Sequence, residues 1–262
     1  MFRSLRIAAL GMAAQQLNVD TISNNLSNVN TTGYKKNSVE FQDLLYETIQ
    51  TGQNESGDNV TPPASIQIGL GSRPVATFRS FSQGALVETG NSLDIAINGN
   101  GFLQILRSDG TYAYTRAGAL NVTAEGYLVN QAGLHVYPEI TVPANASSIK
   151  ISSDGVISVL VNGDADPEEI GHLELASFIN PAGLKAIGGG LFEETEASGA
   201  PSFGTPGSEG FGTIYQGYLE KSNVDVVEEM INLIVAQRAY EVNSKSVKVS
   251  DELMAMTNNL KS

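Results

Sequence analysis

The 262-residue chain contains no cysteine and no tryptophan, and only 7% of its residues are aromatic. The absence of cysteine excludes disulfides, thiolate metal ligands and a cysteine nucleophile. It does not define a compartment, because a protein without cysteine tolerates an oxidising environment without needing one. Few aromatic side chains, together with 27 glycines, favour a turn-rich β protein over a compact enzyme core.

Basic residues are also scarce, and their distribution is uneven. Lysine and arginine number 15 against 28 aspartate and glutamate residues, so the net charge is −13. Residues 1–36 carry a net charge of +3 and residues 220–262 a net charge of −2. The intervening residues 37–219, with six bases and twenty acids, carry −14. An acidic centre repels nucleic acid, so we expect no DNA or RNA partner, whereas nearly neutral ends can approach each other closely.

No hydrophobic run approaches the roughly 20 apolar residues that span a bilayer, so we expect a protein that does not cross the membrane. Arg3 and Arg6 precede the largely apolar run 7–14, a faint likeness to a secretory signal. Hydrophobic spacing continues unbroken through this region to Val29, which a removable leader would not need. We therefore expect no cleaved signal peptide.

Catalytic and metal-binding constellations are hard to find. His135 and His172 lie in β-like runs without neighbours at metal-ligand spacing. The Gly-x-Gly fragments at 69–71 and 99–101 do not continue into a dinucleotide fingerprint. The sequence thus predicts no enzyme, no cofactor and no metal site. Carboxylates are abundant, so an acidic domain that binds or hydrolyses cell-wall carbohydrate stays open as an alternative.

Both ends of the chain carry apolar residues spaced by three and four. This spacing predicts one helix over 4–30 and another over 223–260, each with a coiled-coil seam. Gly33 would end the first helix, and Asn223 or Asp225 would cap the second. The first seam comprises Leu5, Ala8, Met12, Gln15, Val19, Ile22, Leu26 and Val29. The second comprises Met230, Leu233, Gln237, Tyr240, Ser244, Val247, Asp251 and Met254.

The C-terminal helix has a second apolar stripe, formed by Ile231, Val235, Val242, Val249 and Met256. A two-helix hairpin cannot cover apolar surface on more than one side of a helix, whereas a bundle or a tube can. Both ends should therefore order fully only when subunits assemble, and the polar cluster 24–30 would fix the register. The predicted assembly interface comprises Leu5, Met12, Val19, Ile22, Asn25, Leu26, Val29, Met230, Leu233, Tyr240, Val247 and Met254.

The middle of the chain is rich in short β-like runs and turns. The expected fold class is α+β, with the terminal helices in a coiled-coil-like inner domain and a central, mostly β domain that is barrel- or sandwich-like. Asn98-Gly99-Asn100-Gly101 predicts a hairpin between 93–97 and 102–106. The expected domains are the helix 1–33, a connector 34–91 with an insertion at about 46–63, the β domain 92–200, a connector 201–222 and the helix 223–262.

Four stretches of this sequence resemble the bacterial flagellar rod and hook axial protein family. They read ISNNLSNVNTTGYKK at 22–36, SLDIAINGNGFL at 92–103, YQGYLEKSNV at 215–224 and QRAYEVNSK at 237–245. Together they span nearly the whole chain in order. The length and residues 41–50 most resemble the distal-rod members of that family.

This resemblance implies a structural subunit of the flagellar distal rod, which self-assembles into a rigid helical tube that transmits motor torque and encloses the export channel. Implied partners are further copies of the chain, proximal-rod and hook subunits, and the surrounding basal-body rings. The implied location is the basal body, where the rod spans the periplasm, after export by the flagellar type III apparatus. Another rod or hook subunit of the family is the alternative.

Two local features also take their meaning from the resemblance. The segment 46–63 resembles the distal-rod insertion that braces neighbouring subunits. Phe41 and Leu45 are similar to the hydrophobic export-gate signal of rod and hook subunits. The alternative for these two residues is a pair of core side chains one helical turn apart.

Overall fold

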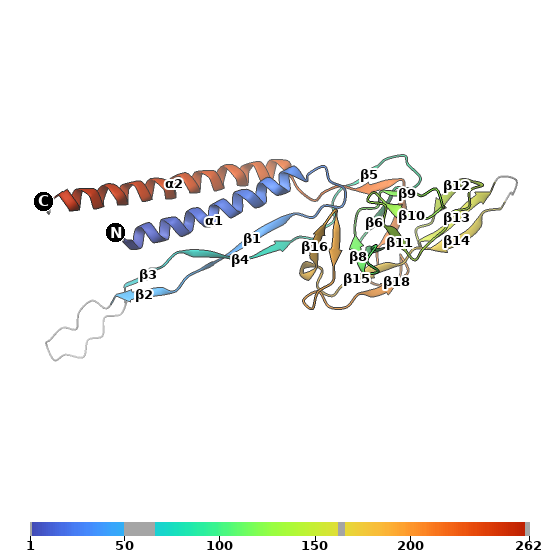
Figure 1. The fold of residues 1–262 in the computed structure, drawn as a ribbon, viewed down its shortest axis with the longest axis horizontal. Coiled ribbons are helices and arrows are strands. Elements are labelled where there is room, and N and C mark those ends of the chain that lie inside the picture. Colours follow the sequence, from blue (N-terminus) through green and yellow to red (C-terminus); the bar gives the residue numbers. More distant parts are fainter. Residues whose placement is uncertain (1, 50–65, 162–165, 260–262) are drawn as a thin grey trace. The chain divides into compact units, whose positions relative to one another are not determined.

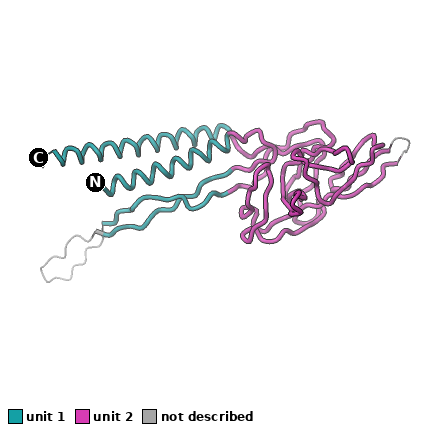
Figure 2. The backbone as a smooth tube through the Cα atoms, in the orientation of Figure 1, with its two compact units in different colours: residues 1–26, 37–78, 226–262 teal, residues 27–36, 79–225 magenta. Residues whose placement is uncertain are grey.

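The computed structural model describes residues 2–49, 66–161 and 166–259. These residues form two compact units, drawn in different colours in Figure 2. Unit 1 consists of Met1–Leu26, Asn37–Phe78 and Val226–Ser262, and unit 2 of Ser27–Lys36 and Arg79–Asp225. Each unit is therefore built from segments that are distant in sequence.

Unit 1 contains the two terminal helices and two antiparallel strand pairs (Figure 1). The predicted helices are confirmed as α1 (Phe2–Ser27) and α2 (Val226–Asn259), with ends shifted by a few residues. The strand pairs are β1 (Asn37–Asp43) with β4 (Ser72–Arg79), and β2 (Tyr46–Ile49) with β3 (Ile66–Gly69). We call these four strands the arm. Most of the expected insertion at 46–63 lies outside the described residues.

Gly33 and Asn223, which were expected at the helix ends, both lie outside the helices. Gly33 has a φ of +69°, as a helix-terminating glycine would, but α1 has already ended at Ser27. An added Cβ at Gly33 would lie 2.7 Å from the backbone nitrogen of Ala117. Asp225 directly precedes α2, at the position of a capping residue, whereas Asn223 lies two residues earlier and its side chain bonds to Lys36, Ser80 and Ser82. Gly33 and Asn223 therefore serve the junctions between segments rather than the helices.

Unit 2 is almost entirely β structure. Its largest sheet has nine strands: seven follow the order β16-β17-β8-β7-β11-β10-β9, and β15 pairs with β7 and with β18. Smaller sheets are β12-β13-β14, β19-β6 and β20-β5, and none of the described sheets closes into a barrel. The strands are β5 (Leu86–Glu88), β6 (Ile95–Asn98), β7 (Phe102–Leu106), β8 (Tyr112–Thr115), β9 (Leu120–Val122), β10 (Leu128–Asn130), β11 (His135–Tyr137), β12 (Ala146–Ile151), β13 (Val156–Val161), β14 (Glu168–His172), β15 (Leu175–Ser177), β16 (Lys185–Gly188), β17 (Leu191–Glu193), β18 (Ser202–Gly204), β19 (Thr213–Gln216) and β20 (Tyr218–Glu220), with a short 3-10 helix at Pro181–Gly183.

The core of unit 2 has two parts. An aliphatic cluster joins the large sheet to the β12-β13-β14 sheet and includes Ile105, Leu128 and Ile157, which are fully buried. A second cluster is mainly aromatic, with Phe102 contacting Phe81 and Phe178 edge to face. Nearly every residue of β7 is buried, because Leu103 and Ile105 join the aliphatic cluster while Phe102, on the opposite face of the strand, joins the aromatic one.

The hairpin predicted across 98–101 is wrong. The strand β6 pairs with β19, and β7 pairs with β8, β11 and β15. Gly99 and Gly101 have φ values of +110° and +134°, well outside the values of a two-residue hairpin turn. An added Cβ at Gly99 would lie 3.0 Å from Gly212 Cα. The glycines therefore carry the chain from one sheet to another where two backbones meet closely.

The segments expected to be connectors also contain strands. These are β1 to β5 in the segment 34–91, and β18 to β20 in the segment 201–222. Most are three or four residues long, too short to show a clear alternating pattern. The strand β20 pairs with β5, and β19 pairs with β6, over a hundred residues away in sequence, so pairing rather than local preference defines them.

Candidate assembly interface

The helices α1 and α2 lie side by side and antiparallel along most of their length (Figure 1). Near one end the Ser4 and Ser250 hydroxyls lie 3.3 Å apart. Near the other end the Asn25 amide donates to Glu229 Oε2 at 3.0 Å. In both pairs the residue numbers add up to 254, so one register holds over 21 residues, about six helical turns.

Apart from Ile22, the buried side chains of these two helices are small or polar. The buried residues of α2 are Glu229, Ala236 and Ser250, which are spaced by multiples of seven. Gly11 in α1 faces Asn243, since a Cβ added there would lie 2.8 Å from Asn243 Nδ2. The buried residues of α1 are Ala8, Ala14, Ile22 and Asn25. Such a seam brings two backbones close but buries little apolar surface.

The seam that faces α1 is therefore not the one that the apolar spacing of α2 predicts. Of the predicted seam, Leu233, Val247 and Met254 are partly covered and Tyr240 is more exposed. At every other position of that seam, the residue that faces inward is the one before the predicted residue. Glu229 lies inward and Met230 is 51% exposed. In the same way Ala236, Asn243 and Ser250 replace Gln237, Ser244 and Asp251. Adjacent residues on a helix differ by 100° in direction, so α2 turns a different face toward its partner.

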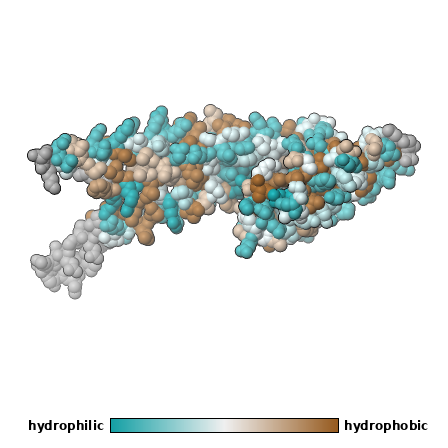
Figure 3. Space-filling model, in the orientation of Figure 1, coloured by the Kyte–Doolittle hydropathy of each residue, from teal (hydrophilic) through white to brown (hydrophobic). Residues whose placement is uncertain are grey.

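Large apolar side chains of α2 consequently face solvent. Val235 and Val242 are each 61% exposed, and Val249 is 53% exposed. Figure 3 shows hydrophobic side chains interspersed along the helical part of unit 1 on the face in view. The exposed large apolar residues of α2 are Val226, Val227, Met230, Ile231, Ile234, Val235, Tyr240, Val242, Val249, Leu253 and Met256. A set of this size is unusual for a monomer and is typical of an interaction surface.

The predicted interface residues of α1 divide into two groups. Leu5, Met12, Val19, Leu26 and Val29 are partly exposed, so they stay candidates for contact with another subunit. Ile22 and Asn25 are buried within the chain. Asn25 also donates to Asn37 O at 2.7 Å and accepts from Asn37 N at 2.9 Å. Neither residue is therefore exposed for contact with another subunit in the single chain, and the hydrogen bonds of Asn25 hold α1 against α2 and β1.

The arm exposes further apolar residues. Phe41 lies in β1 and Leu45 between β1 and β2, and both side chains are exposed. Their alternative interpretation as core residues one helical turn apart is wrong, because this segment is extended and its backbone pairs with the returning strands. Gly71 lies against Leu10 of α1. A two-stranded arm has too little surface to bury its own side chains on both faces.

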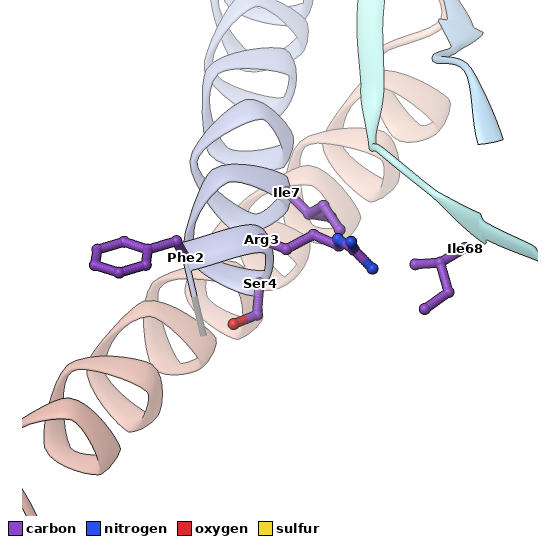
Figure 4. Close-up of a pocket in the computed structure, with 5 residues that line it drawn as sticks. All are labelled: Phe2, Arg3, Ser4, Ile7 and Ile68. Atoms are coloured by element: carbon purple, nitrogen blue, oxygen red, sulfur yellow. The ribbon is translucent and has the colours of Figure 1, made fainter. Parts of the chain in front are cut away.

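A shallow cleft lies between the first turns of α1 and β3, lined by Phe2, Arg3, Ser4, Ile7 and Ile68. Figure 4 shows Arg3 and Ile7 on the side of Ile68, with Phe2 pointing the opposite way. Arg3 forms an ion pair with Glu47 of β2. The described residues that line the cleft include no acid–base pair, and the lining is mostly apolar.

Sequence reasoning missed a buried ionic network in unit 2. Glu220 is fully buried and contacts two cations: Lys35 Nζ at 2.6 Å through Oε1, and Arg116 Nη1 at 3.5 Å through Oε2. Lys35 also donates to Ser82 O at 2.8 Å, and Arg116 to Gly99 O at 2.6 Å. Burial lowers the pKa of the Lys35 ammonium, while the charge of Glu220 opposes that shift. Two of these residues, Lys35 and Glu220, lie in the family motifs at 22–36 and 215–224. Their place in those motifs was the sequence feature that could have pointed to the network.

Each histidine lies beside a glutamate. His135 lies 3.7 Å from Glu139 and its ring packs against Tyr127, and His172 lies 3.6 Å from Glu174. Among the residues that the structure describes, no group of three or more histidine or acidic side chains is placed to hold a metal ion. Neither described helix is long and apolar enough to cross a bilayer.

Models of known families match three segments of the chain. Residues 5–35 match the model described as flagella basal body rod protein. Residues 96–159 match the flagellar hook protein FlgE/F/G D1 domain, and residues 215–260 match the flagellar basal body rod FlgEFG protein C-terminal model. The first and last matches coincide with the two helices and the network segments beside them.

Curated relatives are similar over essentially the full length. The flagellar basal-body rod protein FlgG of Borreliella burgdorferi is 49% identical, over 100% of this chain and 99% of that protein. The protein of the same name from Buchnera aphidicola is 47% identical, over 97% of this chain and 98% of its own. The one from Caulobacter vibrioides is 46% identical, over 99% and 100%.

Proposed function

Because the chain belongs to the flagellar basal-body rod protein family, we propose that it is a structural subunit of the distal rod, which assembles with copies of itself into a rigid helical tube. In this role the tube transmits motor torque and encloses the protein-export channel. The protein works in the basal body, where the rod spans the periplasm, and performs no chemistry of its own. Proximal-rod subunits, hook subunits and the surrounding rings are its neighbours.

The observation that carries this proposal is the outward apolar surface of α2. The small and polar seam with α1 leaves residues such as Val235, Val242 and Val249 exposed in the single chain. Burying apolar surface at about 25 cal/mol per Å² is the main source of association free energy. A helical array of copies covers such a surface on more than one side, which a simple dimer does not.

The polar seam has a complementary role. Hydrogen bonds between Ser4 and Ser250, and between Asn25 and Glu229, fix how the two helices of one subunit pair. A polar group in a helix seam favours one register, because other registers leave it without a partner. Each subunit therefore offers its neighbours a defined surface, which a regular tube requires.

Electron microscopy and sedimentation of the purified full-length protein test the proposal. We expect straight tubes above a critical concentration. Leu26→Asp, at a partly exposed position of α1, should prevent tube growth and leave the β structure of unit 2 folded, as read by circular dichroism. A protein that stays monomeric under all conditions and binds cell-wall glycan would instead favour the carbohydrate alternative.

We further propose that Phe41 and Leu45 serve as an export signal for the flagellar type III apparatus. Their exposure on the arm supports recognition of this pair by another protein. The double change of Phe41 and Leu45 to Ala should reduce secretion from flagellated cells. Phe78→Ala, at a similarly exposed position on the neighbouring strand β4, is the matched control. Equal secretion of both variants would remove the assignment.

A further inference from the structure

The chain passes between the two units four times, after residues 26, 36, 78 and 225. On the unit 2 side, these crossings involve three segments of the chain. The segment 27–36 both enters and leaves unit 2, and the chain re-enters unit 2 at Arg79, the last residue of β4. Residues 220–225 lead into α2. Whatever fixes these segments to one another also fixes the end of α1, the start of α2 and both ends of the arm.

Hydrogen bonds join the three segments directly. Lys36 N donates to Asn223 Oδ1 at 2.7 Å, and Ser80 N donates to Lys36 O at 2.9 Å. The Asn223 amide donates to Ser80 O at 3.0 Å and to Ser82 Oγ at 2.9 Å. Gly33 N donates to Glu220 O at 2.8 Å. Each segment is thus bonded to both of the others.

The buried ionic network lies at the centre of these bonds. Glu220 Oε1 accepts from Lys35 Nζ at 2.6 Å and from Gly84 N at 2.9 Å. One carboxylate therefore contacts the 27–36 segment and the 79–84 segment, and itself belongs to the third. Arg116, whose guanidinium lies over the Phe102 ring, ties the carboxylate to the sheet core. Because Lys35 and Glu220 are fully buried, removal of one partner leaves a charge that water cannot reach.

We propose that Glu220, Lys35, Arg116 and Asn223 form an electrostatic clamp that holds the three connecting segments together in unit 2 whether or not unit 1 is ordered. The Lys35–Glu220 pair joins residues 185 positions apart. It closes a chain loop as a disulfide would, in a protein that has no cysteine.

One consequence of the clamp concerns assembly and rests on the proposed function. If the terminal helices order only when a subunit is incorporated, the clamp keeps the end of α1 and the start of α2 adjacent in the free subunit. When the helices pair, the chain between them is already held together by the clamp, so the effective loop that pairing closes is short. The entropic cost of pairing is therefore lower than for a loop that comprises all of unit 2. The clamp itself does not depend on that function.

Hydrogen exchange of the full-length monomer tests the clamp. Glu220→Gln should speed exchange at the amides of Gly33, Lys36 and Gly84 together, by roughly 100-fold, because the variant leaves two buried cations without their anion. Amides of β7 and β13 should keep their protection. The matched control is Glu193→Gln, which breaks the exposed Lys185–Glu193 pair at 3.3 Å and should change none of these rates.

Lys35→Met keeps the test decisive if Glu220→Gln unfolds unit 2. It leaves Glu220 paired with Arg116, so it should open the same three segments to a smaller extent while β7 stays protected. Two results would overturn the clamp. One is faster exchange at Gly84 alone, without Gly33 and Lys36. The other is exchange that becomes equally faster throughout unit 2 in the Lys35 variant. Restored protection in a Lys35→Met, Glu220→Leu double variant would overturn its electrostatic basis.

The assembly consequence has its own readout. The lag before polymerisation should lengthen for Lys35→Met and not for Glu193→Gln. An unchanged lag with the exchange effect present would remove the consequence and keep the clamp. Failure of the unaltered protein to polymerise would count against the proposed function, and the exchange result would still decide the clamp.

Discussion

The sharpest prediction concerns three valines on the outward face of α2. Val235, Val242 and Val249 are spaced by seven residues and face away from the seam with α1. Replacing all three by serine should leave the monomer intact, because serine and valine have nearly the same helix propensity and exposed positions contribute little to stability. The same change should strongly weaken assembly, in which we propose that these side chains become buried.

The size of that effect follows from the exposed surface. Fully burying a valine side chain contributes about 1.5–3 kcal/mol. The exposed fractions are 61%, 61% and 53%, so covering what remains would contribute roughly 3–4 kcal/mol per subunit at about 2 kcal/mol per valine. Since about 1.4 kcal/mol corresponds to a tenfold change in an equilibrium constant, the critical concentration should rise roughly 100- to 1,000-fold.

Sedimentation over a concentration series, checked by electron microscopy, measures the critical concentration. Urea unfolding followed by circular dichroism measures the stability of the monomer, which should stay within about 0.5 kcal/mol. The matched control replaces two exposed polar residues of the same helix that lie outside the predicted seam, Asn232 and Asn258, by serine, and should assemble normally. The reasoning fails if the valine variant assembles at the original concentration or if the control loses assembly equally.

Three further changes test individual contacts. Asn25→Ala removes the hydrogen bonds that join α1 to α2 and β1 and should cost roughly 2–3 kcal/mol of stability in unit 1, measured by urea unfolding; a cost below 0.5 kcal/mol would contradict the assigned contacts. Gly33→Ala forces a Cβ to 2.7 Å from a backbone nitrogen at a φ of +69° and should lower the melting temperature of unit 2 through strain of about 1–3 kcal/mol, whereas an unchanged melting temperature would argue against this turn. Burial raises the pKa of Tyr114 from 10.0 to about 12, so the folded protein should bind this proton more tightly than the unfolded chain and lose stability as the pH rises from 10 to 12; Tyr114→Phe should remove that part of the loss.

The sequence predicts the helices well and their contact less well. Spacing by three and four identifies α1 and α2 because a helix places such residues on one face. The helix α2 has two apolar stripes, and neither of them forms the whole face that packs against α1. Small residues, Gly11 and Ala236 among them, allow a closer approach than Met230 could, so packing selects the polar and small face. Apolar spacing alone could not predict that choice.

Strand pairing shows the same division. The segments 156–161 and 128–130 were predictable as strands from their composition and flanking turns. The partner of β6 was not, because Gly99 and Gly101 satisfy a hairpin pattern although they lead the chain between sheets. Local preferences identify a strand, whereas its neighbour depends on contacts over a hundred residues away.

Residue spacing and composition are enough to predict the α+β class, the two terminal helices and the excess of apolar surface on α2, and four motifs identify the family. The face of α2 that meets α1, and the burial of Asn25 and Ile22, follow from three-dimensional packing. It alone brought Lys35, Arg116 and Glu220 together. The physical reason is that periodicity and composition are local properties of the chain. The direction a helix faces, and the pairing of charges 185 residues apart, depend on close packing between distant segments.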